Sequence, residues 1–341
     1  MVLKAAVLYA NDDLRYDDYE TPSAKEGTVV IKVHYTGICG SDVPRVLYNG
    51  AHYYPIVLGH EFSGEIIETG QNVTALGIGD RAAGVPLIPC MKCEDCQRGD
   101  YSLCKHYSFI GSRQQGGFAE YVNVPAINAI KFDSSISFEQ AAFFEPSTVA
   151  LHGLKQNGYR GGGDVAVLGG GTVGIFTLQW AKIFGAKSVT VFDISDERLE
   201  ICKAFGADYT VNPNDGKYGK NTYNYVFETA GAADTMRLAF DIAANRAGIC
   251  FIGTPVKELT FSPGLFENMN RKEFRLTGSW MSYSAPFPGN EWLLTAHYFK
   301  TGRLRFDERL IFKKYHMSRA SEAFALYKAP GTVKGKILLY N

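Results

Sequence analysis

A glycine-rich turn between a strand and a helix constrains this chain more than any other feature of its sequence. Residues 164–168 have the pattern of a short buried strand, and residues 172–184 have the periodicity of a helix. They are joined by a turn of the pattern G-x-G-x-x-G, which consists of Gly169, Gly170, Gly171, Thr172, Val173 and Gly174. Because such a turn belongs to a βαβ unit, the sequence predicts a parallel sheet at this place.

Each glycine of the pattern has a physical task. Gly169 permits the tight turn, Gly171 lets a pyrophosphate approach the backbone, and Gly174 lets the helix pack closely on the strand. The helix begins at Thr172 and Val173, where its first N–H groups are free to bind phosphate. The turn therefore predicts a dinucleotide cofactor.

An acidic residue follows the next predicted strand. Asp193 comes directly after residues 188–192. Its carboxylate can accept hydrogen bonds from both ribose hydroxyls and would repel the extra phosphate of NADP, so we expect NAD. Arg198 lies on the following predicted helix, where it either covers the adenosine ribose or is a solvated surface arginine.

The pattern of elements changes along the 341 residues. This length exceeds the roughly 250 to 300 residues at which one core stops growing, so we expect two domains. Short strands dominate the first part, beginning with residues 1–10, and strands alternate with helices further on. We predict an α/β fold, with a Rossmann domain of doubly wound parallel sheet at residues 150–284. The remaining residues, 1–149 and 285–341, are expected to form a β-rich domain.

Charge and hydropathy exclude several kinds of partner. Lys plus Arg and Asp plus Glu both number 35, so no global field draws the protein to nucleic acid or to an anionic membrane. The N-terminal residues lack the features of a signal peptide, and no stretch reaches the roughly 18 apolar residues of a membrane span. We therefore expect a cytoplasmic protein with neither nucleic-acid nor membrane partners.

Four of the seven cysteines are grouped in one loop-like segment. They are Cys90, Cys93, Cys96 and Cys104. Four thiols at this spacing can close a tetrahedral cage around a structural zinc ion that has no open position. Disulfides are the alternative, which a reducing cytosol disfavours. Cys202 and Cys250, on a predicted helix and strand, are expected to be small buried hydrophobes.

A second set of metal-binding residue types is spread over three motifs. Cys39 follows a strand pattern, and His60 and Glu61 come later in a Gly-His-Glu run. Glu145 opens a predicted helix. Each alone would more often belong to a core, but together they supply the thiolate, imidazole and carboxylate of a zinc site with an open position. Such a site can stabilise an alkoxide while hydride passes to a dinucleotide.

Together these motifs resemble the zinc-containing medium-chain alcohol and polyol dehydrogenases over essentially the whole chain. The resemblance is carried by the four-cysteine segment, the glycine-rich turn and the runs Cys39-Gly40-Ser41-Asp42, Gly59-His60-Glu61-Phe62-Ser63-Gly64 and Gly116-Gly117-Phe118-Ala119-Glu120-Tyr121. It implies a GroES-like catalytic domain plus a Rossmann domain, and assembly as a homodimer or homotetramer.

The resemblance also implies roles for individual residues. The catalytic zinc would be held by Cys39, His60 and Glu145, and Glu61 would be a neighbour able to exchange onto the metal. Ser41 would hydrogen-bond the substrate hydroxyl and begin the removal of its proton.

One position departs from the pattern of the family. Many members carry a histidine five residues after the zinc cysteine as the outer member of a proton relay, and this chain has Pro44 there. Proline cannot pass on a proton. Another route is expected, through ribose hydroxyls and water, or through Glu61 or Glu145.

Further runs resemble family members that act on polyol phosphates. They are residues 39–45, 49–55, 109–113 and 278–281. We expect oxidation of galactitol 1-phosphate to tagatose 6-phosphate with NAD; the alternatives are a free polyol of the sorbitol type, threonine, or a non-catalytic nucleotide-binding role. A phosphate needs a cationic clamp, and plain surface charge is the alternative reading of each candidate. The candidates are Arg45, Arg113, Arg271 and Lys272.

Overall fold

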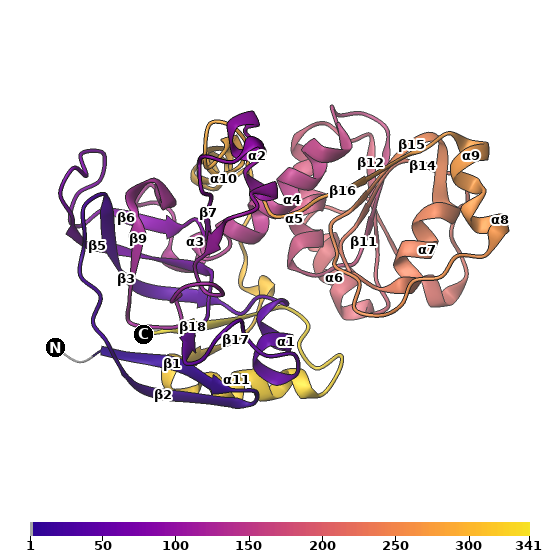
Figure 1. Cartoon of the computed structure of the whole chain (residues 1–341). Helices are drawn as coiled ribbons and strands as arrows, with labels where there is room; N and C mark the ends of the chain where they lie inside the picture. Colours follow the sequence, from indigo (N-terminus) through magenta and orange to yellow (C-terminus); the bar gives the residue numbers. More distant parts are fainter. Residues whose placement is uncertain (1–2) are drawn as a thin grey trace. The chain divides into compact units, whose positions relative to one another are not determined.

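The computed structural model describes residues 3–341 and divides into two compact units (Figure 1). Unit 1 comprises Met1–Glu145, Tyr283–Gly302 and Phe306–Asn341, and unit 2 comprises Pro146–Ser282 and Arg303–Arg305. The strand predicted at residues 1–10 is confirmed as β1 (Leu3–Ala10), while its first two positions lie outside the described residues.

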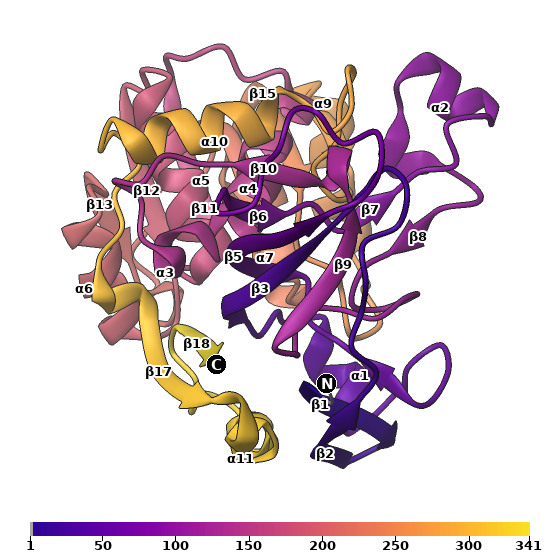
Figure 2. The ribbon, with the colours of Figure 1, turned by 90° about the vertical axis from the view of Figure 1, so that its left-hand side faces the viewer.

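Unit 1 is built on mainly antiparallel strands. After β1 these are β2 (Asp13–Tyr19), β3 (Thr28–Gly37), β4 (Ile56–Val57), β5 (Glu61–Thr69), β6 (Arg81–Gly84), β7 (Leu87–Ile88), β8 (Ser108–Phe109), β9 (Tyr121–Pro125), β10 (Ala129–Lys131), β17 (Ile311–His316) and β18 (Lys336–Tyr340). One sheet has the order β10-β6-β5-β3-β18-β17, with β9 also paired to β3; another has the order β2-β1-β4. Figure 2 shows β3, β5 and β9 side by side.

The apolar side chains of β3 explain why this strand is central to its sheet. Val29, Ile31 and Val33 alternate along it and are buried in one core cluster with Phe62 and Val122 from the two neighbouring strands. Such alternation is the period of a strand with one face in the core. The cluster fastens β5 and β9 to β3.

Helices in unit 1 are short, and they connect or cover strands. They are α1 (Asp42–Leu47), α2 (Glu94–Arg98), α3 (Phe138–Ala141), α10 (Asn290–Lys300) and α11 (Ala320–Ala325), while α4 (Phe144–Asn157) runs from unit 1 into unit 2. A capping box begins α3, because the Ser137 hydroxyl accepts from the backbone of Gln140 and the Gln140 side chain accepts from the backbone of Ser137. Single 3-10 turns occupy Tyr101–Leu103, Ala126–Asn128, Pro213–Asp215, Glu308–Leu310, Met317–Arg319 and Leu326–Lys328.

Unit 2 is a parallel sheet with the order β13-β12-β11-β14-β15-β16. Its strands are β11 (Asp164–Leu168), β12 (Ser188–Phe192), β13 (Tyr209–Val211), β14 (Tyr223–Glu228), β15 (Ala243–Phe251) and β16 (Arg275–Gly278), and its helices are α5 (Thr172–Ile183), α6 (Asp196–Ala204), α7 (Ala233–Ile242), α8 (Pro263–Phe266) and α9 (Asn268–Lys272). Numbered from β11, this is the strand order 3-2-1-4-5-6 of the Rossmann fold, whose ligands bind where the order reverses, at the carboxyl ends of the strands. The predicted doubly wound domain is confirmed.

Two further features bear on the predictions. The predicted burial of Cys202 on α6 and Cys250 on β15 is confirmed, since neither side chain is exposed. Among the described residues, no helix combines the length and the apolar character that crossing a bilayer requires.

We predict that Gly64→Ala destabilises unit 1. Gly64 lies on β5 opposite Val33, and a Cβ there would overlap the carbonyl oxygen of Lys32. Forcing an atom into such a packed place costs about 1–3 kcal/mol, so the denaturation midpoint should fall. The control is Gly77→Ala, whose Cβ would meet no described atom within 4 Å. Equal midpoints for the two variants in a urea titration would contradict this account of the β3–β5 contact.

Candidate active site

Two paired strands bring together residues that lie far apart in the sequence. Cys39 follows β3, His60 precedes β5, and the register places Gly37 opposite Glu61. As a result, one ligand atom each of Cys39, His60 and Glu61 lies within 4.8 Å of the others. A thiolate, an imidazole and a carboxylate at this spacing are a donor set that suits zinc.

Asp42 orients the histidine of this group. It is fully buried at the start of α1, where its Oδ2 accepts a hydrogen bond of 3.2 Å from the backbone N–H of Cys39. Its Oδ1 lies 3.5 Å from Nδ1 of His60. A carboxylate on one ring nitrogen leaves the other directed at a metal, as in carboxylate–histidine–zinc arrangements.

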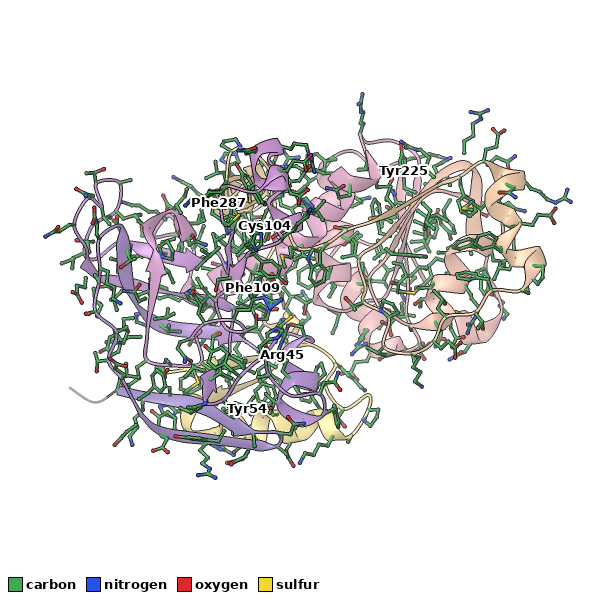
Figure 3. All side chains as sticks on the ribbon, viewed as in Figure 1. Arg45, Tyr54, Cys104, Phe109, Tyr225 and Phe287 are labelled. Atoms are coloured by element: carbon green, nitrogen blue, oxygen red, sulfur yellow. The ribbon has the colours of Figure 1, made fainter. Side chains whose placement is uncertain are left out.

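The surroundings of His60 favour a cation. Burial alone lowers the pKa of His60, but the Asp42 carboxylate and the Cys39 thiolate outweigh it and raise the pKa well above its usual value. The ring of Phe109, which Figure 3 labels, meets the ring of His60 edge to face, with 5.5 Å between the ring centroids. Because buried negative groups here attract positive charge, the residues fit a divalent metal ion.

Glu61 is held by a buried lysine. Nζ of Lys336, the first residue of β18, lies 2.7 Å from Oε1 and 2.6 Å from Oε2 of Glu61. It also donates to the carbonyl of Ile38 at 3.2 Å. Burial alone lowers the pKa of Lys336, but Glu61 and Cys39 raise it above its usual value, so the lysine is cationic.

Glu145 is the second carboxylate near these residues. It is the second residue of α4 and lies outside the group within 4.8 Å. Loss of hydration is the main cause that raises the pKa of Glu145 to about 7; His60 opposes the shift and Glu61 adds to it. The structure thus places two carboxylates, Glu61 and Glu145, in the electrostatic field of His60.

Ser41 and Arg45 extend the site along α1. Nη1 of Arg45 donates to the carbonyl of Ser41 at 2.7 Å and to its hydroxyl oxygen at 2.9 Å. The same hydroxyl lies 3.4 Å from the sulfur of Cys39. Ser41 is exposed, so a fixed hydroxyl is offered to a ligand beside the metal residues.

Two of the four predicted phosphate-clamp residues lie in unit 1. Nη1 of Arg113 is 3.0 Å from Nε2 of His52, and Nη2 donates to the hydroxyl of Tyr107 at 3.0 Å. Burial is the main cause that lowers the pKa of His52, and the charges of Arg113 and Arg45 add to it. Figure 3 labels Arg45 on the ribbon of unit 1.

The other two clamp residues lie in unit 2 and have partners there. Arg271 is exposed on α9 and pairs with Glu267 at 2.9 Å. Lys272 is buried and donates to the carbonyls of Phe240 and Asp241 at 2.9 and 3.1 Å. Each of these two side chains therefore already has a partner within unit 2.

The four-cysteine segment has the geometry of a closed zinc site. Its four sulfur atoms lie within 4.8 Å of one another, with 3.9 Å for the pairs Cys90–Cys96 and Cys93–Cys104. A tetrahedron of sulfurs at 2.3 Å from zinc has edges of about 3.8 Å. The backbone N–H of Cys96 is the main cause that lowers the pKa of Cys93 to about 6, which favours the thiolate. All four thiols are free and fit the metal.

In unit 2 the glycine-rich turn leaves room for a pyrophosphate. Gly169 has φ of +108°, which favours glycine, and a Cβ on Gly174 would overlap the Gly169 carbonyl. At Gly171 an added Cβ would meet no described atom within 4 Å. Thr172 and Val173 begin α5, whose first N–H groups lie beside this space. The cradle fits the dinucleotide.

Asp193 is fixed at the end of β12. Its Oδ2 accepts from the N–H of Gly170 at 2.8 Å and its Oδ1 from the N–H of Ser195 at 2.9 Å. Nη1 of Arg198 lies 3.7 Å from Oδ2. The turn and the acidic residue are thereby joined in one rigid arrangement.

Three residues of these sites were not predicted from the sequence. Asp42 lies three residues after Cys39, and this position could have predicted its role, because an acidic residue near a metal ligand often orients a metal-binding histidine. Nothing in the sequence around His52 points to its contact with Arg113. Lys336 opens the last strand, and nothing near it in the sequence points to Glu61.

Comparisons with known proteins agree with this architecture. Residues 25–134 match the family "Alcohol dehydrogenase GroES-like domain", and residues 172–295 match "Zinc-binding dehydrogenase". The galactitol 1-phosphate 5-dehydrogenase of Escherichia coli K12 is 38% identical over 99% of both chains. The D-xylulose reductase of Scheffersomyces stipitis is 31% identical over 96% of both.

Solved structures agree as well. The galactitol-1-phosphate dehydrogenase of Escherichia coli superposes with a TM-score of 0.94 at 38% identity, covering 99% of this chain and 100% of that one. A putative zinc-binding dehydrogenase of Sinorhizobium meliloti, bound to NADP, gives a TM-score of 0.91 at 28% identity, with both chains fully covered.

The GroES-like and Rossmann folds, with two metal-binding groups and a dinucleotide cradle, define a zinc-dependent oxidoreductase that uses NAD(P). More narrowly, the chain belongs to the zinc-dependent alcohol and polyol dehydrogenase family.

We predict that Asp42→Asn weakens metal binding at the Cys39 and His60 group. Loss of a carboxylate that orients a metal-binding histidine typically costs about 10- to 100-fold in affinity. The measurement is titration of the demetallated protein with zinc against a chelator, which resolves this ion from the one at the four cysteines. Asp215→Asn, an exposed aspartate of unit 2, serves as control. If Asp42→Asn binds zinc at the Cys39 and His60 group as tightly as wild type does, Asp42 has no orienting role.

A pair of glycine variants separates cofactor binding from folding. Gly171→Ala points a methyl group into open space, so we expect an unchanged unfolding midpoint with NADH binding weakened at least about tenfold, because the pyrophosphate loses its close approach. Gly174→Ala should lower both stability and NADH affinity, because its Cβ overlaps the Gly169 carbonyl. NADH fluorescence and thermal unfolding measure the two effects. Full NADH affinity in Gly171→Ala would place the cofactor elsewhere.

Proposed function

We propose that the enzyme oxidises a secondary alcohol of a polyol phosphate, with NAD as the hydride acceptor. The favoured reaction converts galactitol 1-phosphate to tagatose 6-phosphate. The observation that carries the proposal is that Arg45 contacts Ser41, which in turn contacts Cys39, while the charges of Arg113 and Arg45 both lower the pKa of His52. Guanidinium groups bind phosphate in a bidentate way, and a free polyol would give them no partner.

The position of Arg45 links the phosphate to the reacting alcohol. It donates to Ser41, and Ser41 contacts Cys39, so a substrate held by this arginine has a hydroxyl near the metal residues. The second candidate pair is the weaker one because Arg271 forms an ion pair with Glu267 and Lys272 is buried against backbone carbonyls. We therefore assign the clamp to Arg45 and Arg113.

The chemistry divides between the cofactors and the chain. When bound, zinc stabilises the alkoxide form of an alcohol and NAD accepts a hydride. Cys39 and His60, with Glu145 as the proposed third ligand, would hold the ion, and Asp42 orients His60. The remaining task of the chain is to remove one proton from the substrate hydroxyl.

We assign the first step of this proton removal to Ser41. Arg45 fixes its hydroxyl oxygen by a donated hydrogen bond. The oxygen keeps a second lone pair that can accept the substrate proton, while the serine passes its own proton on to the next group of the path. Pro44 follows in α1 and carries no group for a relay. The onward path remains a prediction, through ribose hydroxyls and water or through Glu61 or Glu145.

NAD is proposed over NADP because of Asp193. Its carboxylate is held at the carboxyl end of β12 by two backbone N–H groups, where it would repel a 2′-phosphate. Nη1 of Arg198 lies 3.7 Å from this carboxylate, so the charge of the arginine is paired with Asp193. An acid that is fixed in this way favours the unphosphorylated ribose.

Three coarser features complete the proposal. The reduced thiols of the two metal groups suit a reducing compartment, so we place the enzyme in the cytoplasm. The domain bounds proposed from the sequence are 1–149 with 285–341 for the catalytic domain and 150–284 for the Rossmann domain. A homodimer or homotetramer is the proposed assembly.

We predict that Arg113→Ala lowers kcat/KM for galactitol 1-phosphate about tenfold or more, since hydrogen bonds to charged groups contribute about 1.5–3 kcal/mol. Activity on galactitol itself should change little. Arg45→Ala should lose more, and on both substrates, because it also releases Ser41. Arg271→Ala, paired with Glu267, is the matched control and should behave as wild type.

NADH absorbance with phosphorylated and free hexitols, each with NAD and NADP, gives the measurement. Equal losses on both substrates for Arg113→Ala would discard the clamp. A wild-type preference for free polyol or for threonine would replace the proposed substrate by that alternative.

A further inference from the structure

Arg113 is a half-buried arginine that forms no ion pair with an acidic residue in the described part of the chain. Its Nη1 lies 3.0 Å from Nε2 of His52, and its Nη2 donates to the hydroxyl of Tyr107 at 3.0 Å. The guanidinium also lies over the ring of Tyr107, with 4.4 Å between Cζ and the ring centroid. Because imidazole and phenol are neutral partners, the positive charge of Arg113 remains available to an anion.

The contact with Arg113 fixes where the His52 ring carries its proton. A guanidinium group has only donors, so Nε2 of His52 must accept this hydrogen bond. In the neutral ring the single proton is therefore on Nδ1. The side chain of His52 is exposed, and this Nδ1–H group has no hydrogen-bond partner among residues 3–341. It is a donor that a ligand can use.

The charges around His52 keep the ring neutral and favour a bound anion. Partial burial is the main cause that lowers the pKa of His52, and the charged groups that add to it, Arg113 and Arg45, are both cations. A negatively charged ligand beside this ring would thus meet the field of two guanidinium groups together with one N–H donor. Phosphate oxygens accept several hydrogen bonds and suit such a set.

The loop that carries His52 is held in place by hydrogen bonds of its own. The hydroxyl of Tyr54 accepts from the N–H of Ala51 at 3.1 Å and donates to Oδ1 of Asn11 at 2.7 Å. Nδ2 of Asn11 donates to the carbonyl of Tyr48 at 2.8 Å. The loop is therefore tied on both sides of His52, and a loop that is ordered before its ligand arrives loses less entropy on binding.

We propose that His52 is a specificity-determining residue of the substrate site: its Nε2 positions Arg113, and its Nδ1–H donates to the phosphate of the substrate. The inference rests on the proposed function, because it assigns a further contact to the same polyol phosphate. A free polyol brings no charge to Arg113, so replacement of His52 should matter far less for that substrate.

Two substitutions separate the two roles of the ring. His52→Gln places an amide oxygen near the position of Nε2, where it can accept from Arg113, and His52→Asn places an amide N–H near the position of Nδ1, where it can donate to phosphate. We expect each to raise KM for galactitol 1-phosphate severalfold. His52→Ala should raise it about tenfold or more, because hydrogen bonds to charged groups are lost.

The turnover number and the free polyol show whether the effect is specific. kcat should change little in these variants, because only substrate binding is weakened, and KM for galactitol should also change little. His297→Ala, which replaces an exposed histidine of α10, is the matched control and should behave as wild type. Equal increases in KM for both substrates would indicate a general structural role and would overturn the inference.

Ring-nitrogen NMR of the zinc-loaded enzyme, with isotope-labelled histidines, tests the inference without substrate. The signals of His52 are those that disappear in His52→Ala. They should report a proton on Nδ1, and added inorganic phosphate should shift the Nδ1 signal. In Arg113→Ala the phosphate concentration needed for half of this shift should rise, because one cation of the site is gone.

The two measurements distinguish failure of this inference from failure of the proposed function. A wild-type KM for galactitol 1-phosphate in His52→Ala, or a His52 signal that inorganic phosphate does not shift, would overturn the role of His52. A wild-type enzyme that prefers a free polyol, while phosphate still shifts the His52 signal, would refute the proposed substrate and support the anion site.

Discussion

The pairing of β3 with β5 on one side and β18 on the other is the constraint on which the active site depends. Cys39 follows the end of β3, His60 precedes β5, and Lys336 opens β18, so the register of two antiparallel ladders sets how these side chains meet. A shift of one residue would turn every side chain of a strand to the other face. The core under β3 and β5 resists such a shift, because their alternating apolar residues are buried on one side.

Each reactive group in this site is held by a partner of defined charge. Asp42 orients His60, Lys336 binds Glu61, and Arg45 fixes Ser41. Asp42 and Lys336 act in a buried setting, where electrostatic interactions are stronger than in water and an unpaired charge is costly. The donor set for the metal is therefore preorganised before any ion binds.

Unit 2 and the four-cysteine segment could be predicted because their determinants are local. The predicted strands at residues 164–168 and 188–192 are confirmed as β11 and β12, and the predicted helix at 172–184 is confirmed as α5, which ends at Ile183. In each case the spacing of residues in a short segment is enough to predict the local geometry. These segments are the glycine-rich turn, the acidic residue after the next strand, and the four thiols within fifteen positions (90 to 104).

The sequence by itself determined the classes of the two units, the cofactor turn and the residue types of both metal groups, because periodicity and short motifs encode local geometry. Only the tertiary structure decided that β18 joins β3, that Lys336 meets Glu61, and that Arg113 contacts His52. Lys336 and Ile38, which are hydrogen-bonded where β18 meets the end of β3, lie 298 positions apart, and strand pairing over such distances leaves no periodic trace in the chain. Such pairing depends on which sheet edges and which buried charges come into contact once the core has formed.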